Sequence, residues 1–284
     1  MRSIRRVQGW PRCPLTVAAL ALLLVSAAPW PGGRAAAEPI RIGGTGGALG
    51  AMRMLGEAFR KHEPATPVVI FPTLGSGGGI KAVLTGNLDL GVSARPLTAE
   101  ERALGAREEV FGKTAMVFAV AKISPVSGVT TREVTDIYSG TMTAWPDGDT
   151  IRLVLRPPDD TDIRQLIAKS PGMKRAVEAA LARKGMISAL TDQEAANYLE
   201  KVSGAFGTTV LSLIIAEKRP LRALALDGVE PNVKALSDGK WPLVRVFVLV
   251  TGAGSSPATK RFVHFLRSTE GRRVLLQAGC VAVR

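Results

Sequence analysis

The sequence predicts an α/β protein built from two lobes, and three observations lead to this fold class. Short apolar runs alternate with helical patterns along the chain, and this alternation is typical of α/β architectures. Residues 38–284 could form one domain, but two lobes of roughly 100–150 residues are the commoner solution at that length. Glycine-rich segments join the first two strands to the helices that follow, as in open α/β sheets.

The segment 1–37 is expected to be an export signal that is removed. Its basic start contains Arg2, Arg5, Arg6 and Arg12. An apolar stretch from Pro14 to about Ala28 follows, and Ala35–Ala37 offers a cleavage site before Glu38. The stretch is short for a membrane span, although an uncut N-terminal anchor remains the alternative. We therefore expect a periplasmic protein whose mature chain begins at or near Glu38, exported by either the Sec or the twin-arginine route.

The chain is strongly basic, with a formal net charge of +13. The segment 1–37 contributes five arginines and no acidic residue, so the rest of the chain carries +8. This excess fits either a solvated basic surface or a field that draws anions into a cleft. Nucleic acid is a poor partner for an exported chain with 5% aromatic residues and no clustered run of Lys and Arg.

Cysteine and histidine are too scarce for a disulfide or for the usual metal sites. Cys280 is the only cysteine after residue 37, and it is expected to be a small core residue. His62 and His264 fall on separate predicted helices, so we expect no metal, no cofactor and no Ser-His-Asp triad. Without a visible nucleophile and base pair, the chain is not expected to be an enzyme.

The elements follow in order along the chain. Predicted strands cover 40–43, 67–71, 88–92, 115–121, 151–155, 221–226 and 244–251. Predicted helices cover 48–62, 78–84, 132–138, 162–169, 173–184, 192–202, 257–267 and 270–278. In the first helix one face carries Leu49, Met52, Leu55 and Phe59, and this face should enter the core.

Two glycine-rich loops are the chemical features of the N-terminal half. Gly43–Gly47 and Leu74–Gly79 each place flexible backbone at the start of a helix. Free N–H groups and the helix dipole favour an anion there, and glycine allows it to approach closely. The alternative for either loop is an ordinary glycine turn. Neither loop contains a complete nucleotide-binding motif.

Several segments, in order along the chain, resemble the phosphate-binding proteins of phosphate ABC transporters. They are Gly75–Lys81, Asp89–Leu97, Thr135–Gly140 with Trp145, Leu153–Arg156, Gly204–Gly207, Leu226–Val229, Trp241–Leu243 and Ser268–Gly271. The resemblance implies a two-lobed, type II-like periplasmic solute-binding fold. Two mixed sheets with flanking helices would be joined by a two-strand hinge, with crossings near 118–122 and 242–247. Lobe one would then comprise 38–120 and 244–284, and lobe two 121–243.

The same resemblance implies a ligand site between the lobes. Its expected residues are Gly47, Ala48, Leu49, Ser76, Gly77, Gly78, Arg95, Arg156, Asp160, Thr161 and Asp162. Ser76 matches a loop serine that binds an anion oxygen, and Arg156 matches an arginine that forks to the anion.

Three segments of the chain depart from that family's pattern. Ala48-Leu49 stands where the family has a threonine and an aromatic residue, and Ala94 replaces its proton-accepting aspartate. Asp159–Asp162 replaces a Ser-Gly-Thr loop, where the acidic residues could accept ligand protons or simply cap a helix. Arg95 could contact the ligand or lie on a surface loop.

The resemblance implies a monomeric receptor for phosphate or a related oxyanion, with an ABC permease as its membrane partner. Two alternatives stay open at this point. One is the same scaffold with an organic anion or zwitterion whose cationic group pairs with Asp160 or Asp162. The other is a sensor or adaptor that docks to a membrane partner without transport.

Overall fold

The computed structural model describes residues 38–283, and the predicted export signal lies outside these residues. None of the helices in this range is long and apolar enough to cross a membrane. The strands between residues 38 and 283 are β1 (Ile40–Gly44), β2 (Val68–Ile70), β3 (Leu90–Ser93), β4 (Arg107–Ala121), β5 (Gly128–Val129), β6 (Arg152–Leu155), β7 (Ile187–Ser188), β8 (Ala205–Val210), β9 (Leu221–Ala223), β10 (Ala225–Leu226), β11 (Val244–Thr251) and β12 (Cys280–Ala282).

The helices alternate with these strands, as the α/β pattern predicts. In the same described range they are α1 (Gly46–His62), α2 (Gly75–Leu84), α3 (Ala99–Ala103), α4 (Thr131–Ser139), α5 (Thr161–Lys169), α6 (Pro171–Ala182), α7 (Asp192–Lys201), α8 (Leu211–Ala216), α9 (Val233–Ser237), α10 (Pro257–Arg267) and α11 (Thr269–Gln277).

Strand β4 connects two mixed sheets. The continuous strand order is β2-β1-β3-β11-β4-β8-β6-β7, with β12 and β9 also paired to β4. The part of β4 from Arg107 to Ala115 pairs antiparallel with β11, whereas Met116 to Ala119 pairs antiparallel with β8. Strands β2, β1 and β3 run parallel, as do β8, β6 and β7. The mixed α/β class is therefore confirmed.

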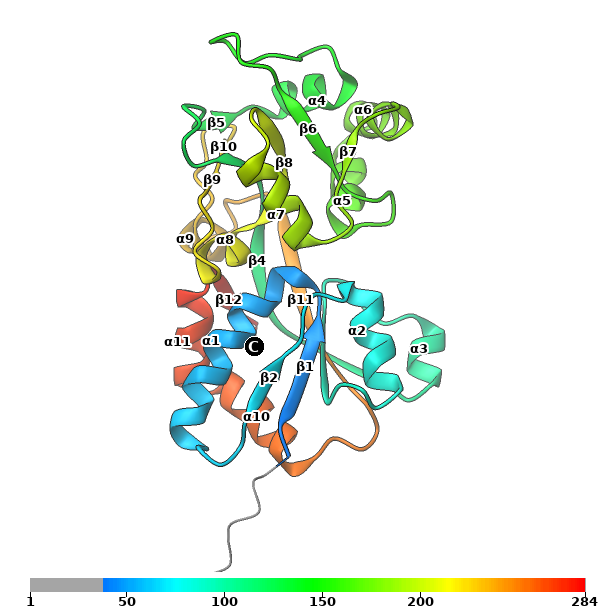
Figure 1. Cartoon of the computed structure of the whole chain (residues 1–284), viewed down its shortest axis with the longest axis vertical. Helices are drawn as coiled ribbons and strands as arrows, with labels where there is room; N and C mark the ends of the chain where they lie inside the picture. The colour runs from blue at the N-terminus through cyan, green and yellow to red at the C-terminus, as the bar shows by residue number, and fades with distance from the viewer. Residues whose placement is uncertain (1–37, 284) are drawn as a thin grey trace, which may run out of the picture. The chain divides into compact units, whose positions relative to one another are not determined.

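Each sheet has helices and buried apolar side chains on both faces. In the sheet that contains β1, helices α1, α10 and α11 share a core with Phe111 and Phe247, while α2 covers a smaller core around Val250. Figure 1 shows α1 and α11 on one side of β1, and α2 and α3 on the other. In the sheet that contains β6, helices α4, α5 and α6 share one core and α7 another. The apolar face predicted for the first helix is confirmed, because Leu49, Met52, Leu55 and Phe59 are all buried.

The largest difference from the predicted elements lies in β4 and β8. The first half of β4, Arg107–Thr114, is mostly polar, so it carries no apolar run that would predict a strand. Strand β8 is fully buried, but Gly207, Thr208 and Thr209 interrupt its apolar pattern. Both segments are strands because their neighbours in the sheet supply hydrogen bonds, which the local sequence does not reveal. Cys280 lies in the core as predicted.

Candidate functional site

The first glycine-rich loop ends at the start of α1, where hydrogen-bond donors are paired with a residue of another helix. Thr45 is the N-cap residue of α1 but makes no side-chain cap hydrogen bond, and the first turn of α1 holds no acidic residue. Instead the N–H of Gly47 donates to Oδ2 of Asp192 at 2.8 Å, and Oγ1 of Thr45 donates to the same oxygen at 3.2 Å. The carboxylate of Asp192 therefore takes the place that an anion takes at a helix N-terminus.

Asp192 belongs to a buried cluster of two arginines and three aspartates. Its Oδ1 accepts from Nη1 of Arg245 at 2.7 Å and lies 3.6 Å from Nη2 of Arg156. Arg245 also donates through Nη2 to Asp162. Arg156 donates through Nη2 to Asp160 at 2.7 Å and through Nη1 to the carbonyl of Ala189 at 3.0 Å.

Local structure places each member of this cluster. Arg156 follows β6 directly, and Arg245 is the second residue of β11. Asp160 caps α5 by accepting from the N–H of Asp162, which confirms the capping interpretation of this segment. Asp192 is the first residue of α7, whose cap is Thr191. The amino ends of α5 and α7 favour carboxylates, so both helix dipoles help to hold the aspartates in place.

Burial makes the charges of the cluster strongly dependent on one another. Arg245 is 1% exposed and Asp162 is 0% exposed. Burial alone would raise the pKa of Asp192, but the positive charges of Arg245 and Arg156 outweigh it and hold that pKa below its ordinary value. Burial raises the pKa of Asp162, and repulsion from Asp160 and Asp192 opposes the lowering effect of Arg245. The surroundings thus shift the two pKa values in opposite directions, that of Asp192 down and that of Asp162 up.

Some polar atoms of the cluster are left without hydrogen bonds. Among the described residues, Nε of Arg156, Nε of Arg245 and Oδ2 of Asp162 are buried and have no hydrogen-bond partner. Unpaired buried polar atoms are costly and occur where a ligand or water completes the network. The cluster therefore still offers two donors and one acceptor.

The second glycine-rich loop meets the start of α5. Oγ of Ser76 accepts from the N–H of Ala94 at 2.9 Å, and Oγ1 of Thr161 lies 3.5 Å from the carbonyl oxygen of Ala94. Gly77 and Gly78 are exposed in the first turn of α2. The structure thus brings Ser76 and Thr161 to a common place beside the charged cluster.

Other predicted site residues have different surroundings. Ala48 and Leu49 are fully buried, and their side chains pack in the core that α1 shares with its sheet. Arg95 donates to both carboxylate oxygens of Glu101, at 2.8 and 2.7 Å, and to the carbonyl of Pro96 at 2.9 Å. The guanidinium of Arg95 is therefore occupied within its own loop, which supports the surface-loop alternative.

Asp192 and Arg245 are the members of the cluster that sequence analysis missed. Arg245 carried a signal, because it is a lone charge inside the apolar run Val244–Thr251 and must be paired if that strand is buried. Asp192 carried no such signal, since an acidic residue after Thr191 is ordinary at a helix start.

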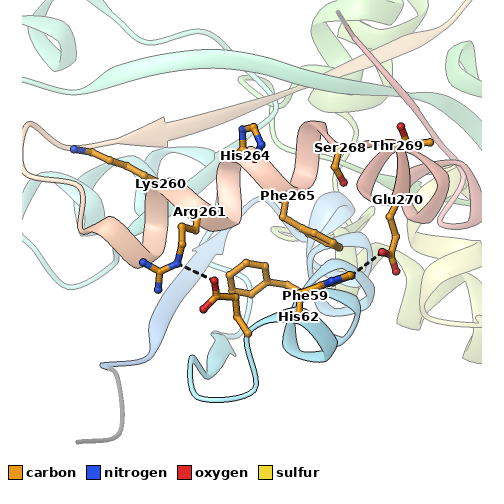
Figure 2. A pocket seen from close by; sticks show the side chains of 10 residues that line it. Phe59, His62, Lys260, Arg261, His264, Phe265, Ser268, Thr269 and Glu270 are labelled. Atoms are coloured by element: carbon orange, nitrogen blue, oxygen red, sulfur yellow. Dashed lines mark hydrogen bonds and ion pairs between the residues drawn. The ribbon is translucent and has the colours of Figure 1, made fainter. Parts of the chain in front are cut away.

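A separate groove of about 700 Å³ lies at the other end of α1. Figure 2 shows Phe59 and Phe265 in this groove, with His62 paired to Glu270 at 2.7 Å. His264 lines it too, so both histidines border one groove despite their distance in sequence. Phe59 and His62 follow Gly47 by 12 and 15 residues within α1, which puts the groove about 20 Å from the charged cluster. Within residues 38–283 no group of three or more His, Cys, Asp or Glu side chains is arranged to hold a metal ion.

Comparison with known proteins gives consistent matches. The profile of the PBP superfamily domain matches residues 30–270. The phosphate-binding protein PstS of Bacillus subtilis is 24% identical over 225 residues, which cover 75% of this chain and 70% of that protein. Protein SphX of Synechococcus elongatus is 27% identical over 248 residues, which cover 76% of this chain and 69% of that protein.

A solved structure from Clostridium perfringens has the same two-lobed fold. It is described as a putative phosphate ABC transporter substrate-binding protein with bound phosphate. Its TM-score is 0.72 at 21% identity, and the match covers 87% of this chain and all of the other.

Proposed function

The chain belongs to the PBP superfamily, and from this premise we propose that it is an extracytoplasmic receptor that binds phosphate or a related oxyanion and delivers it to an ABC permease. The relatives that match most of the chain include a phosphate-binding protein and SphX, and a structure of the same fold is described with bound phosphate. The segment 1–37 would export the chain to the periplasm. The protein would capture its ligand without changing it chemically.

The ligand would bind between two lobes. We assign residues 38–120 and 244–284 to lobe one and residues 121–243 to lobe two. Strands β4 and β11 would form the hinge, because β4 exchanges its partner β11 for β8 between Ala115 and Met116. Closure about such a hinge is the usual response of this architecture to a ligand.

The observation that carries the proposal is the pair of unsatisfied groups in the cluster. Nε of Arg156 is a buried donor and Oδ2 of Asp162 is a buried acceptor, and neither has a partner among the described residues. A hydrogen phosphate ion brings both complements, an anionic oxygen for the donor and a hydroxyl for the acceptor. Asp162 of lobe two would then accept the hydrogen bond from the phosphate hydroxyl, in place of the carboxylate that is missing at Ala94.

The test is a comparison of phosphate with sulfate on the mature protein, residues 38–284. We expect phosphate to raise the melting temperature in a dose-dependent manner and sulfate to raise it much less, because sulfate at neutral pH has no proton to donate. Asp162→Asn should narrow this difference, since an amide can donate to sulfate. Absence of any shift with phosphate would contradict the proposal, and an unchanged preference in Asp162→Asn would remove that residue from selectivity.

A second candidate, a zwitterionic or cationic organic ligand, is favoured by one specific observation. The cluster holds three carboxyl groups, Asp160, Asp162 and Asp192, against two guanidinium groups. An ammonium group near Asp160 would balance this excess. A melting-temperature increase with amino acids but not with phosphate would favour this candidate.

A further inference from the structure

The carboxylate of Asp192 is bound in the way that an anionic ligand is bound. It receives one backbone N–H and one hydroxyl from the start of α1, through Gly47 and Thr45. Its Oδ1 also accepts a hydrogen bond from Nη1 of Arg245 and lies 3.6 Å from Nη2 of Arg156. Donors at a helix start and guanidinium groups are the groups with which proteins commonly bind an oxyanion.

This anion comes from a distant element of the same chain. Asp192 opens α7 and lies 145 positions after Gly47. Two neighbouring contacts join the same parts, because Nε2 of Gln193 donates to the carbonyl of Gly46 at 3.1 Å and Oγ of Ser212 donates to the carbonyl of Gly47 at 2.7 Å. The start of α1 is therefore tied to α7 and α8 by three hydrogen bonds of Gly46 and Gly47.

We propose that Asp192 is an internal competitor of the ligand, whose carboxylate occupies the anion position at the start of α1 and must be displaced from Gly47 when an external oxyanion binds. The inference rests on the proposed function and adds to it the residue that limits affinity. While Asp192 stays in place, it holds Arg245 and repels a second anion. Its negative charge thus sets how tightly an external anion can bind.

Replacement of the charge by an isosteric amide tests the competition. In Asp192→Asn the neutral amide accepts a weaker hydrogen bond from Gly47 and no longer repels the ligand, since bonds to charged groups are roughly twice as strong as neutral ones. We expect phosphate affinity, measured by titration calorimetry, to rise by about tenfold or more.

Asp89→Asn is the matched control for this measurement. Like Asp192→Asn, it removes one negative charge from an ion pair. This pair joins Asp89 to Arg41 at 3.0 Å and lies away from the cluster. Phosphate affinity should stay within about twofold of the original protein, as expected for a screened surface charge. Equal or weaker phosphate binding by Asp192→Asn, with binding by the original protein intact, would overturn the inference.

A second measurement needs no ligand. Hydrogen exchange of the Gly47 amide, read by NMR, should be slow in the ligand-free protein and fast in Asp192→Ala, because Asp192 is the acceptor of that N–H. The change keeps the cap residue Thr191, so α7 should still form. Rapid exchange of Gly47 in the unaltered ligand-free protein would overturn the inference by itself.

The two measurements separate this inference from the proposed function. If neither the original protein nor Asp192→Asn binds phosphate, the phosphate proposal fails, and the Gly47 amide alone decides the role of Asp192. Protection of that amide that depends on Asp192 would then support an internal anion at α1. If phosphate binds but Asp192→Asn gives no gain, the function stands and the competition is excluded.

Discussion

The two glycine-rich loops have similar local sequences but different surroundings in the structure. At the first loop the N–H of Gly47 is held by the carboxylate of Asp192. At the second loop Ser76 holds the backbone of Ala94, and Gly77 and Gly78 are exposed. Neither helix has an acidic residue in its first turn or a side-chain cap. Whether a helix start is open to a ligand is thus decided by what packs against it and not by its own sequence.

The largest expected effect concerns Arg245, which pairs with Asp192 at the first glycine-rich loop. Arg245→Met would leave Asp162 and Asp192 buried without their main cation, and breaking a buried pair in this way costs about 3–5 kcal/mol of the free energy of unfolding. Urea denaturation measures this loss.

Arg41→Met is the control, because its pair with Asp89 is partly exposed and should contribute less than about 1 kcal/mol. A similar loss in both variants would show that the buried cluster has no special role in holding the first loop.

The next effect concerns Arg156, which pairs with Asp160 at 2.7 Å and lies 3.6 Å from Asp192. Arg156→Ala removes a buried donor to the ligand, at a cost of roughly 2–5 kcal/mol of binding free energy. Phosphate affinity should therefore fall by about 30-fold or more in titration calorimetry. Arg152→Ala, at the exposed first residue of β6, should leave affinity nearly unchanged. Unchanged affinity in Arg156→Ala would remove this arginine from the site.

A matched pair of glycine changes compares the loops directly. A Cβ atom at Gly47 would lie 2.7 Å from Cγ2 of Val210 and 3.2 Å from Nη1 of Arg245, whereas at Gly77 the nearest such atom is Nη2 of Arg95 at 3.8 Å. Gly47→Ala should cost about 1–3 kcal/mol of stability through overpacking. Gly77→Ala should be neutral or slightly stabilising, because alanine favours a helix. If thermal denaturation shows the same change in stability for Gly47→Ala and Gly77→Ala, the first loop is not packed more tightly than the second.

The smallest effect is a pH dependence beside the second loop. The hydrogen bonds from Arg95, together with the N–H of Thr98, lower the pKa of Glu101 to about 2, although partial burial opposes them. Since this folded-state pKa lies below the unfolded value, the pair stabilises the fold above about pH 4.5 and loses this contribution as the pH falls towards 2.

Glu101→Gln should therefore lower stability slightly at pH 6, by less than about 1 kcal/mol for so accessible a pair. The difference from the original protein should shrink at pH 3, as measured by urea denaturation. A difference that grows at low pH would show that Glu101 is not held by Arg95.

Much of the fold follows from local patterns in the sequence. The apolar face of α1 and the full extents of β11 and α10 could be predicted, because periodicity and caps act over a few neighbouring residues. The first half of β4 could not, since its polar residues become a strand only through pairing with β11 and β12. Its identity as a strand is a property of the assembled sheet.

The site was less predictable than the fold for the same reason. The sequence predicts one site for Ser76, Arg156, Asp160 and Thr161, and these residues lie close together in the structure. The side chains of Ala48 and Leu49, which are also predicted site residues, lie in the core. No local pattern predicts the role of Asp192, because its contact with Gly47 joins residues 145 positions apart.

The position of β4 has a consequence for the order in which the chain folds. Its first half pairs with β11 and β12, which end at Thr251 and Ala282, close to the end of the chain. Its second half pairs with β8 and β9, which are complete by Ala223. Loop closure over a long separation slows folding. The sheet around β8 is therefore expected to form before the sheet around β1, which needs β11 and β12 to pair with β4.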